Sequence, residues 1–282
     1  MIIDFHTHTF PARISADVLA KLSRLSHTKY FTNGSVPDLT ASMEEASIDY
    51  SVNLPVMTSA EQVEKVNGAL IADRDRLFEQ GIITFGGMHP GYGDYKKELI
   101  RLKENGILGI KIHPAYQSTE IDDIRMMRII DAASDLGLIV LTHAGIDIGI
   151  YDHNYTSVQQ VLKIIDEVRP PKFVLAHMGG WGCWEDVERD LLGAPVWFDT
   201  AFAIGPITPD DAKSGAPYLN TNLTEDAFMR IVRKHGADQI LFATDSPWES
   251  QKDYVARIEA MPLDKEEKEM IFSGNARKLL HI

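Results

Sequence analysis

Short apolar runs alternate along the chain with longer segments whose apolar residues recur at helical spacing. Eight of the runs have the length of a β-strand and are bounded by Gly, Pro, Asp or polar turns. They cover residues 2–8, 50–55, 82–88, 109–113, 138–143, 172–177, 196–199 and 239–245. The segments between them predict amphipathic helices, most clearly over residues 39–46, 60–78, 95–105, 121–136, 158–168 and 225–235. This alternation is typical of a parallel sheet whose two faces are both covered by helices.

Eight strands favour closure into a (β/α)8 TIM barrel, and we expect one α/β domain over residues 1–282. An open doubly wound sheet is the main alternative, but it normally brings a Gly-rich phosphate-binding turn, which this sequence lacks. Two connections are longer than a barrel requires, residues 9–38 after the first strand and residues 200–223 after the seventh. Both leave the carboxyl face of the barrel, where loops line active sites. Each is therefore either a lid and specificity element or an ordinary surface excursion.

Composition narrows the class of protein. The net charge of −13 argues against a nucleic-acid partner. No apolar run approaches the roughly 18 residues that a membrane span needs, and a strand predicted from residue 2 leaves no room for a signal peptide. The single cysteine, Cys183, excludes an intrachain disulfide and fits a reducing compartment. We expect a cytoplasmic protein that acts on a small molecule, and the sequence leaves open whether it forms a homodimer.

Side chains of the kind that bind metal ions end four of the predicted strands. These are His6 and His8 on the first strand, His143 on the fifth, His177 on the sixth and Asp245 on the eighth. Because residues two apart in a strand point the same way, we expect Asp4, His6 and His8 to share one face. A lone His-x-His pair is more often structural than functional. Three further ligand-type residues at the same end of a barrel make a metal site the better explanation.

Six segments together carry a family resemblance. They are Ile3-Asp4-Phe5-His6-Thr7-His8, Gly109-Ile110-Lys111-Ile112-His113-Pro114, His143-Ala144-Gly145, His177-Met178-Gly179-Gly180, Thr244-Asp245-Ser246-Pro247 and Gly274-Asn275-Ala276-Arg277-Lys278-Leu279-Leu280. In this order the chain resembles the amidohydrolase superfamily, and within it the amidohydrolase 2 branch that includes the aminocarboxymuconate semialdehyde decarboxylase-like proteins. The resemblance implies one divalent metal ion held by His6, His8, His143 and Asp245. It also implies that His177 acts in catalysis, or binds a second ion in two-metal members.

The chemistry of these side chains agrees with the implied roles. Three imidazoles and one carboxylate suit Zn²⁺, with Mn²⁺, Fe²⁺ or Co²⁺ as substitutes. Such an ion lowers the pKa of a bound water to around 7. Asp245 can accept that water's proton, and His177 can orient the water or stabilise negative charge on the substrate. Without a metal ion, Asp245 would instead be a turn or helix-cap residue.

Lys111 and His113 share one face near the end of the fourth predicted strand. In two-metal relatives a carboxylated lysine from strand four bridges the ions, so the resemblance leaves a second metal open. For Lys111 we favour an ammonium that binds an acidic substrate, or a structural ion pair with Asp4 or Asp245, over the carbamate. His113 and His89 each precede a proline at a strand end, and each either lines the pocket or stabilises a turn.

Trp181 and Trp248 directly follow metal-bearing strands. They either stack on a planar substrate or pack the loops of the carboxyl face. Histidines elsewhere in the chain, His235 among them, are expected on the solvated surface.

Two enzyme classes and one non-enzyme class fit these observations. We expect a metal-dependent hydrolase that uses a metal-activated water on a small amide, ester or lactone-like substrate. The alternative is a non-oxidative decarboxylase of a small unsaturated or aromatic carboxylic acid on the same metal site. Both need a divalent ion and a proton shuttle, so the sequence does not separate them. A non-catalytic binding protein is the third hypothesis, but a degenerate enzyme would be expected to have lost a ligand, and none is missing.

Overall fold

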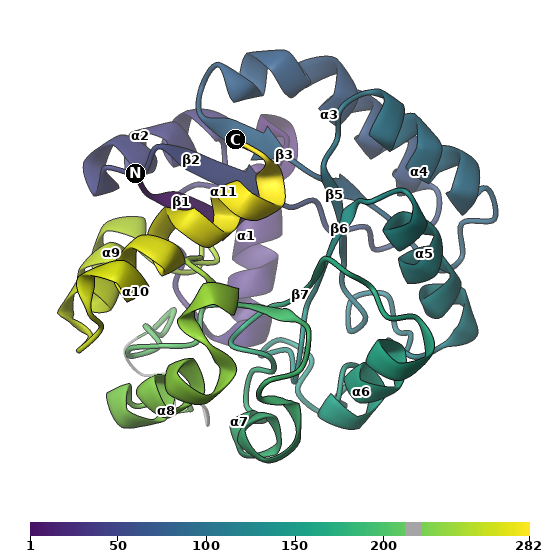
Figure 1. Cartoon of the computed structure of the whole chain (residues 1–282). Coiled ribbons are helices and arrows are strands. Elements are labelled where there is room, and N and C mark those ends of the chain that lie inside the picture. Colours follow the sequence, from purple (N-terminus) through teal and green to yellow (C-terminus); the bar gives the residue numbers. More distant parts are fainter. Residues whose placement is uncertain (212–220) are drawn as a thin grey trace.

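Parallel strands form the centre of the molecule, and helices surround them (Figure 1). This computed structural model describes residues 1–211 and 221–282. The strands are β1 (Ile3–Thr7), β2 (Tyr50–Asn53), β3 (Ile82–Thr84), β4 (Gly86–Gly87), β5 (Gly109–Ile112), β6 (Ile139–Thr142), β7 (Phe173–Leu175), β8 (Trp197–Asp199) and β9 (Ile240–Leu241). Each lies within one of the eight predicted runs, and the third run is divided into β3 and β4.

The strands are arranged in chain order, as a barrel requires. One ladder runs β1-β2-β3 and a second runs β4-β5-β6-β7-β8-β9, with every pair parallel. The two ladders are joined next to Phe85, whose N–H donates to the Asn53 carbonyl at 3.0 Å. The first and last strands are joined where the Phe5 N–H donates to the Phe242 carbonyl at 2.9 Å. The predicted TIM barrel is confirmed.

Helices follow the strands and form the outer layer. They are α1 (Ala12–Ser26), α2 (Val36–Ala46), α3 (Gln62–Phe78), α4 (Tyr95–Glu104), α5 (Ile124–Asp135), α6 (Val158–Glu167), α7 (Trp184–Asp186), α8 (Glu225–His235), α9 (Gln251–Ala260), α10 (Lys265–Glu269) and α11 (Asn275–Leu280). Several begin with a side-chain cap. The Ser157 hydroxyl caps α6 with a complete capping box, and the Thr224 hydroxyl accepts from the Ala227 N–H at the start of α8.

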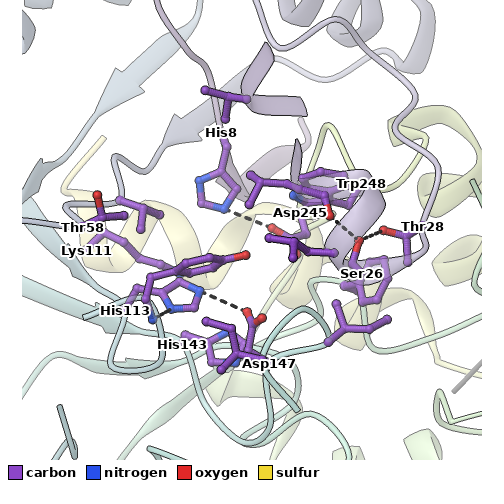
Figure 2. Close-up of a pocket in the computed structure, with 18 of the residues that line it drawn as sticks. His8, Ser26, Thr28, Thr58, Lys111, His113, His143, Asp147, Asp245 and Trp248 are labelled. Carbon is purple, nitrogen blue, oxygen red and sulfur yellow. Dashed lines mark hydrogen bonds and ion pairs between the residues drawn. The ribbon is translucent and has the colours of Figure 1, made fainter. Parts of the chain in front are cut away.

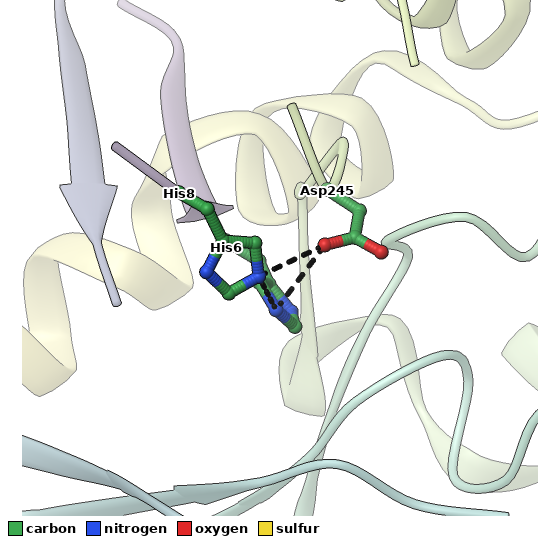
Figure 3. A group of neighbouring side chains, drawn as sticks. All are labelled: His6, His8 and Asp245. Carbon is green, nitrogen blue, oxygen red and sulfur yellow. Dashed lines mark hydrogen bonds and ion pairs between the residues drawn. The ribbon is translucent and has the colours of Figure 1, made fainter. Parts of the chain in front are cut away.

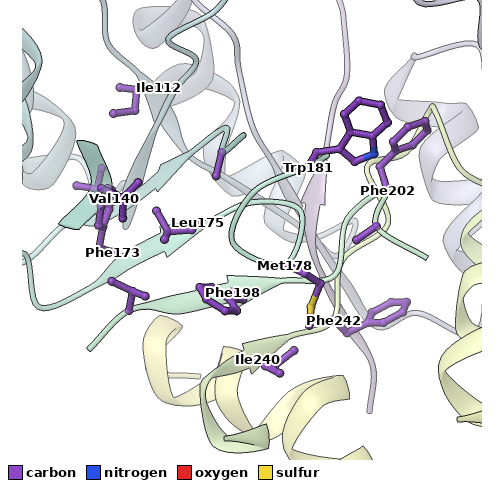
Figure 4. Packing of buried hydrophobic residues seen from close by; sticks show 14 of the residues in the cluster. Ile112, Val140, Phe173, Leu175, Met178, Trp181, Phe198, Phe202, Ile240 and Phe242 are labelled. Atoms are coloured by element: carbon purple, nitrogen blue, oxygen red, sulfur yellow. The ribbon is translucent and has the colours of Figure 1, made fainter. Parts of the chain in front are cut away.

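Alternation along the strands divides the core into two clusters. On β6, Ile139 and Leu141 belong to the cluster inside the barrel. Val140 belongs to the cluster between strands and helices (Figure 4). Leu279 and Leu280 of α11 pack against the inner cluster. The same alternation directs the residue after β6, His143, into the pocket at the carboxyl end of the barrel.

The two long connections have different outcomes. Residues 9–38 contain α1, a helix that was not predicted from the sequence, and the beginning of α2. The connection over residues 200–223 falls partly outside the described residues. Its described ends meet where Ile204 forms a parallel bridge with Leu223. None of the helices in the described part of the chain is long and apolar enough to cross a membrane.

Candidate metal centre

Three ligand-type side chains converge at the carboxyl end of β1 (Figure 3). The Nε2 atoms of His6 and His8 lie 3.2 Å apart. The Asp245 Oδ1 atom lies 3.1 Å from His8 Nε2 and 3.5 Å from His6 Nε2. The backbone sets this arrangement, because the Asp245 N–H donates to the His6 carbonyl at 2.9 Å. The last strand thereby carries its carboxylate to the histidines of the first.

The far side of each imidazole is fixed by a hydrogen-bond acceptor. His6 Nδ1 lies 2.9 Å from Asp199 Oδ2, and His8 Nδ1 lies 2.7 Å from the Leu54 carbonyl. A carbonyl only accepts, so the His8 hydrogen sits on Nδ1 and the Nε2 lone pair points into the centre. Two imidazole lone pairs and a carboxylate at this separation repel one another unless a cation lies among them. These residues therefore fit a divalent metal ion, and the outer acceptors are the usual support of metal-binding histidines.

Asp4 does not share the face of His6 and His8, so that prediction was wrong. Asp4 is fully buried and its Oδ2 accepts from the Thr244 hydroxyl at 2.6 Å and from Gln251 Nε2, on α9, at 2.7 Å. The cause is a register shift in the pairing of β1 with β2 between Asp4 and Thr7. Such an irregularity breaks the two-residue period. Asp4 instead holds the segment that carries Asp245 in place, through its hydrogen bond with Thr244.

His143 and His177 stand beside the trio. The Nε2 atom of His177 lies 3.0 Å from His143 Nδ1, and the rings of His177 and His6 have centroids 5.5 Å apart. His177 Nδ1 lies 2.8 Å from the Ala201 carbonyl, so its hydrogen is on Nδ1 and its Nε2 is an acceptor. The backbone of His177 has φ 60°, a left-handed conformation that is uncommon for a side-chain-bearing residue. Strain of this kind is concentrated at functional sites.

Burial keeps the imidazoles of His6, His143 and His177 neutral. It lowers the pKa of His6 and His143 well below the ordinary histidine value, and that of His177 to about 4. Neutral imidazole is the form that binds metal ions. His6 and His143 are therefore in the protonation state that metal binding requires at neutral pH.

Lys111 lies against the trio rather than in an ion pair. Its Nζ is 3.0 Å from His6 Nε2, and the side chain is almost completely buried. Among the described residues, no carboxylate oxygen lies within ion-pair distance of this Nζ, so the predicted structural pair with Asp4 or Asp245 does not form. Burial lowers the pKa of Lys111 to about 8. The amine is thus close to the metal ligands, and the carboxylates of Asp199 and Asp245 act on it only from beyond ion-pair distance.

A second group of ligand-type atoms includes His143. It consists of His113, His143 and Asp147, with the His113 Nε2 atom 3.5 Å from Asp147 Oδ2. The rings of His113 and His143 are stacked, with centroids 4.4 Å apart. His143 as a ligand of the first ion therefore stays a prediction, since its ligand atoms fall with this second group. His89, by contrast, lies outside the pocket lining, and its Nδ1 accepts from the Gly91 N–H within a turn.

One pocket of about 540 Å³ encloses these groups (Figure 2). Lys111 and His113 both line it, as their shared strand face predicted. Trp181 and Trp248 line it too. Trp181 is also part of the core, with its Nε1 donating to Asn222 Oδ1 at 2.9 Å, so packing and pocket lining coincide in this residue.

Two acidic residues of the centre were not identified as site residues from the sequence. Asp199 ends β8, so the rule that found His143, His177 and Asp245 at strand ends applies to it as well. Besides meeting His6, it accepts from the His177 N–H through Oδ1 at 2.9 Å. Asp147 had no comparable signal, because it lies in the connection after β6 and meets His113 only in the folded chain.

The family of the chain follows from comparison with known proteins. A family model described as amidohydrolase matches residues 3–282. The chain belongs to the amidohydrolase family. The resemblance expected from the six sequence segments is thus confirmed, and the chain is an enzyme of the amidohydrolase superfamily. A sequence search among proteins of curated function finds no match.

Solved structures share the amidohydrolase barrel over its full length. An uncharacterised TIM-barrel protein from Bordetella bronchiseptica has 17% identity and a TM-score of 0.74, covering 99% of this chain and 98% of its own. A dihydroxybenzoic acid decarboxylase from Polaromonas sp. JS666, with bound manganese and the inhibitor 2-nitroresorcinol, has 15% identity and a TM-score of 0.73, covering 99% and 96%. A 5-carboxyvanillate decarboxylase from Sphingomonas paucimobilis has 15% identity and a TM-score of 0.67, covering 100% and 99%. At these identities the likeness shows the fold.

Proposed function

We propose that this amidohydrolase is a metal-dependent, non-oxidative decarboxylase of a small carboxylic acid. The observation that carries the proposal is the buried Lys111 amine beside the His6, His8 and Asp245 trio, with no carboxylate oxygen of the described residues within ion-pair distance. A buried ammonium needs an anionic partner. A substrate carboxylate placed at the metal centre would supply one. The decarboxylases among the solved structures, whose fold this chain shares, support the same choice over hydrolysis.

The metal would be held by His6, His8 and Asp245, with His143 as the predicted fourth ligand. When bound, a divalent ion supplies positive charge that stabilises negative charge developing on the substrate. Zn²⁺ suits the ligand set, and Mn²⁺, which two of the solved decarboxylases carry, is an equal candidate. The ion would bind the His6 Nε2 atom, which now faces the Lys111 amine. Lys111 would then turn toward the substrate.

The remaining residues of the centre would carry out the proton transfers of the reaction. In decarboxylation the bond to the carboxylate carbon breaks, carbon dioxide leaves, and the carbon that keeps the electron pair takes up one proton. His177 Nε2 is unprotonated and therefore cannot donate that proton at neutral pH. Asp245 would deliver that proton after taking it up from water or from a hydroxyl group of the substrate. His177 would act as an acceptor that positions the substrate or takes a proton from its hydroxyl group.

Hydrolysis is the second candidate, because one observation favours it. The Asp245 carboxylate lies against both Nε2 lone pairs, which is where a carboxylate would take a proton from an activated water. The substrate would then be a small amide, ester or lactone.

A product assay separates the two candidates. Protein loaded with Mn²⁺ or Zn²⁺ would be offered hydroxybenzoates and unsaturated acids, and in parallel a panel of amides, esters and lactones. Release of carbon dioxide with loss of the carboxylate supports decarboxylation. Water-dependent cleavage in the second panel, with no carbon dioxide in the first, contradicts it in favour of hydrolysis. An intact-mass measurement of the protein completes the test, because the added mass of a carboxyl group would indicate that Lys111 is a carbamate that bridges two ions.

A further inference from the structure

The helix α1 turns its apolar face toward the pocket and not toward the core. Its buried residues are Ser15, Leu19, Ser23 and Ser26, of which three are serines. The serine hydroxyls are used by the protein itself, since Ser23 donates to the Thr28 carbonyl at 2.7 Å. A surface helix normally buries its apolar stripe against the core. In α1 most of the buried residues are polar, and the apolar stripe is partly exposed. The stripe therefore lacks the usual contact with the core.

That stripe lines the pocket that contains the metal centre. Ile14, Val18, Leu22 and Leu25 follow one another at helical spacing and all line the pocket. Ile14 is 36% exposed and Leu25 47% exposed, although both are large hydrophobic residues. Val18 and Leu22, between them, are only partly buried, so the four residues form one continuous apolar patch, which marks a binding surface in soluble proteins. The stripe is continuous with the centre through one cavity.

A second apolar wall belongs to the connection after β6. Ile146, Ile148 and Ile150 alternate along this segment, are only partly buried, and line the same pocket. Asp147, between Ile146 and Ile148, lines the pocket on the side of His113, and its Oδ1 accepts from the Gly149 N–H at 2.8 Å. The substrate cavity is thus bounded by aliphatic side chains from two separate elements.

Polar groups in this part of the pocket are already paired. The hydroxyls of Ser26 and Thr28 lie 2.6 Å apart, and Ser26 also donates to the Leu22 carbonyl. Figure 2 shows these two residues across the pocket from Lys111 and His113. The described lining contains no arginine, and its only lysines are Lys111 and the exposed Lys21. This part of the pocket therefore offers little to a charged or strongly hydrogen-bonding group.

We propose that the aliphatic chamber between α1 and residues 146–150 binds an apolar extension of the substrate. The substrate would be a small amphiphile, with one polar reacting group at the metal centre and an alkyl or aryl tail against Val18 and Leu22. The cavity of about 540 Å³ has room for such a molecule. This inference rests on the proposed function only for the place of the polar group.

Binding of straight-chain carboxylates tests the inference without any turnover. Metal-loaded protein would be titrated by calorimetry with butanoate, hexanoate, octanoate and decanoate. Each buried methylene is expected to raise the affinity about three- to four-fold until the chamber is filled. Affinity that stays flat along the series would overturn the proposal. Loss of the proposed decarboxylation alone would leave the series unchanged, so the two failures are distinguishable.

Two variants and a control locate the tail. Leu22→Gln is expected to reduce the gain per methylene to less than two-fold, and Val18→Trp to stop the gain at a shorter chain by filling the chamber. Arg24→Gln, on the exposed side of the same helix, is expected to leave the series unchanged. A gain that survives both pocket variants would place the tail elsewhere and overturn the proposal. So would a dimer, seen by light scattering, that Leu22→Gln dissociates while the carboxylate series is flat, because the stripe would then belong to a second copy.

Discussion

The Asp199 carboxylate meets His6 Nδ1 at 2.9 Å and so holds the imidazole with Nε2 toward the metal centre. Its other oxygen accepts from the backbone N–H groups of His177 at 2.9 Å and Ala201 at 3.1 Å. Both oxygens must therefore be acceptors. An amide offers one oxygen and one N–H group, so it cannot satisfy both sides at once.

We predict that Asp199→Asn lowers the affinity for the metal ion about 10- to 100-fold, which is the usual cost of losing such support. Competition with a chromophoric chelator measures this change. Asp238→Asn, an exposed substitution, is the matched control and should leave the affinity unaltered. Equal affinities for Asp199→Asn and the unmodified protein would show that His6 is oriented without this contact.

Substitutions within the centre are expected to separate metal binding from catalysis. His8→Ala removes a Nε2 lone pair of the trio and should empty the site, whereas His177→Asn should keep the metal content and reduce turnover about 100- to 10,000-fold. Elemental analysis of each purified variant, alongside turnover, gives the two readouts. Loss of the ion in His177→Asn would make His177 a ligand instead of a catalytic neighbour.

Removal of the metal ion should lower thermal stability. A ligand present at about 100 times its Kd stabilises the folded state by about 2.7 kcal/mol. For a chain of this size that corresponds to a Tm shift of roughly 4–5 °C. Thermal unfolding after chelation, and after stepwise return of Zn²⁺ or Mn²⁺, measures it. A Tm that does not respond to either ion argues against a metal centre.

The buried Asp4 is expected to matter for stability. Asp4→Ala leaves the Thr244 hydroxyl and the Gln251 amide without their acceptor, at a cost of about 3 kcal/mol. Urea unfolding gives the free energy of unfolding of this variant and of Asp17→Ala, an exposed control on α1. Similar values for the two variants would mean that water replaces Asp4 without loss.

His235 provides a pH dependence that is independent of the metal centre. Burial lowers its pKa to about 4, and its Nε2 lies 3.1 Å from the Val196 carbonyl. The unfolded chain, with an ordinary histidine pKa near 6.5, binds a proton at pH 5 that the folded chain does not. Stability should therefore fall by about 2 kcal/mol from this group as the pH drops from 7 to 5. In His235→Gln the fall between these pH values should be smaller by that amount, and an identical fall would refute the assignment.

The sequence predicted those parts of the structure that depend on local periodicity. The strand ends that carry His6, His8 and Asp245 were found because alternation locates both the strands and their carboxyl termini. Asp4 was misplaced because a register shift is a property of two paired strands and not of one. His235 was expected at the surface, yet its ring stacks on Phe198 with centroids 3.8 Å apart, a contact that forms only in the folded chain.

The helix α1 shows a different limit. The burial of its residues does not follow hydrophobicity, because serines face inward and aliphatic residues face the cavity. A pattern rule assumes that apolar side chains point to the protein's own core. Where a ligand takes the place of the core, that assumption fails, and the helix is overlooked.

The trio joins the first strand of the barrel to the last, since His6 and His8 come from β1 and Asp245 follows β9. During synthesis on the ribosome, the two histidines emerge long before their carboxylate partner. A nascent chain that ends before β9 has no complete trio, however well its earlier strands are formed. The trio is therefore completed late in synthesis. Binding of the ion requires that the first and last strands of the barrel have come together.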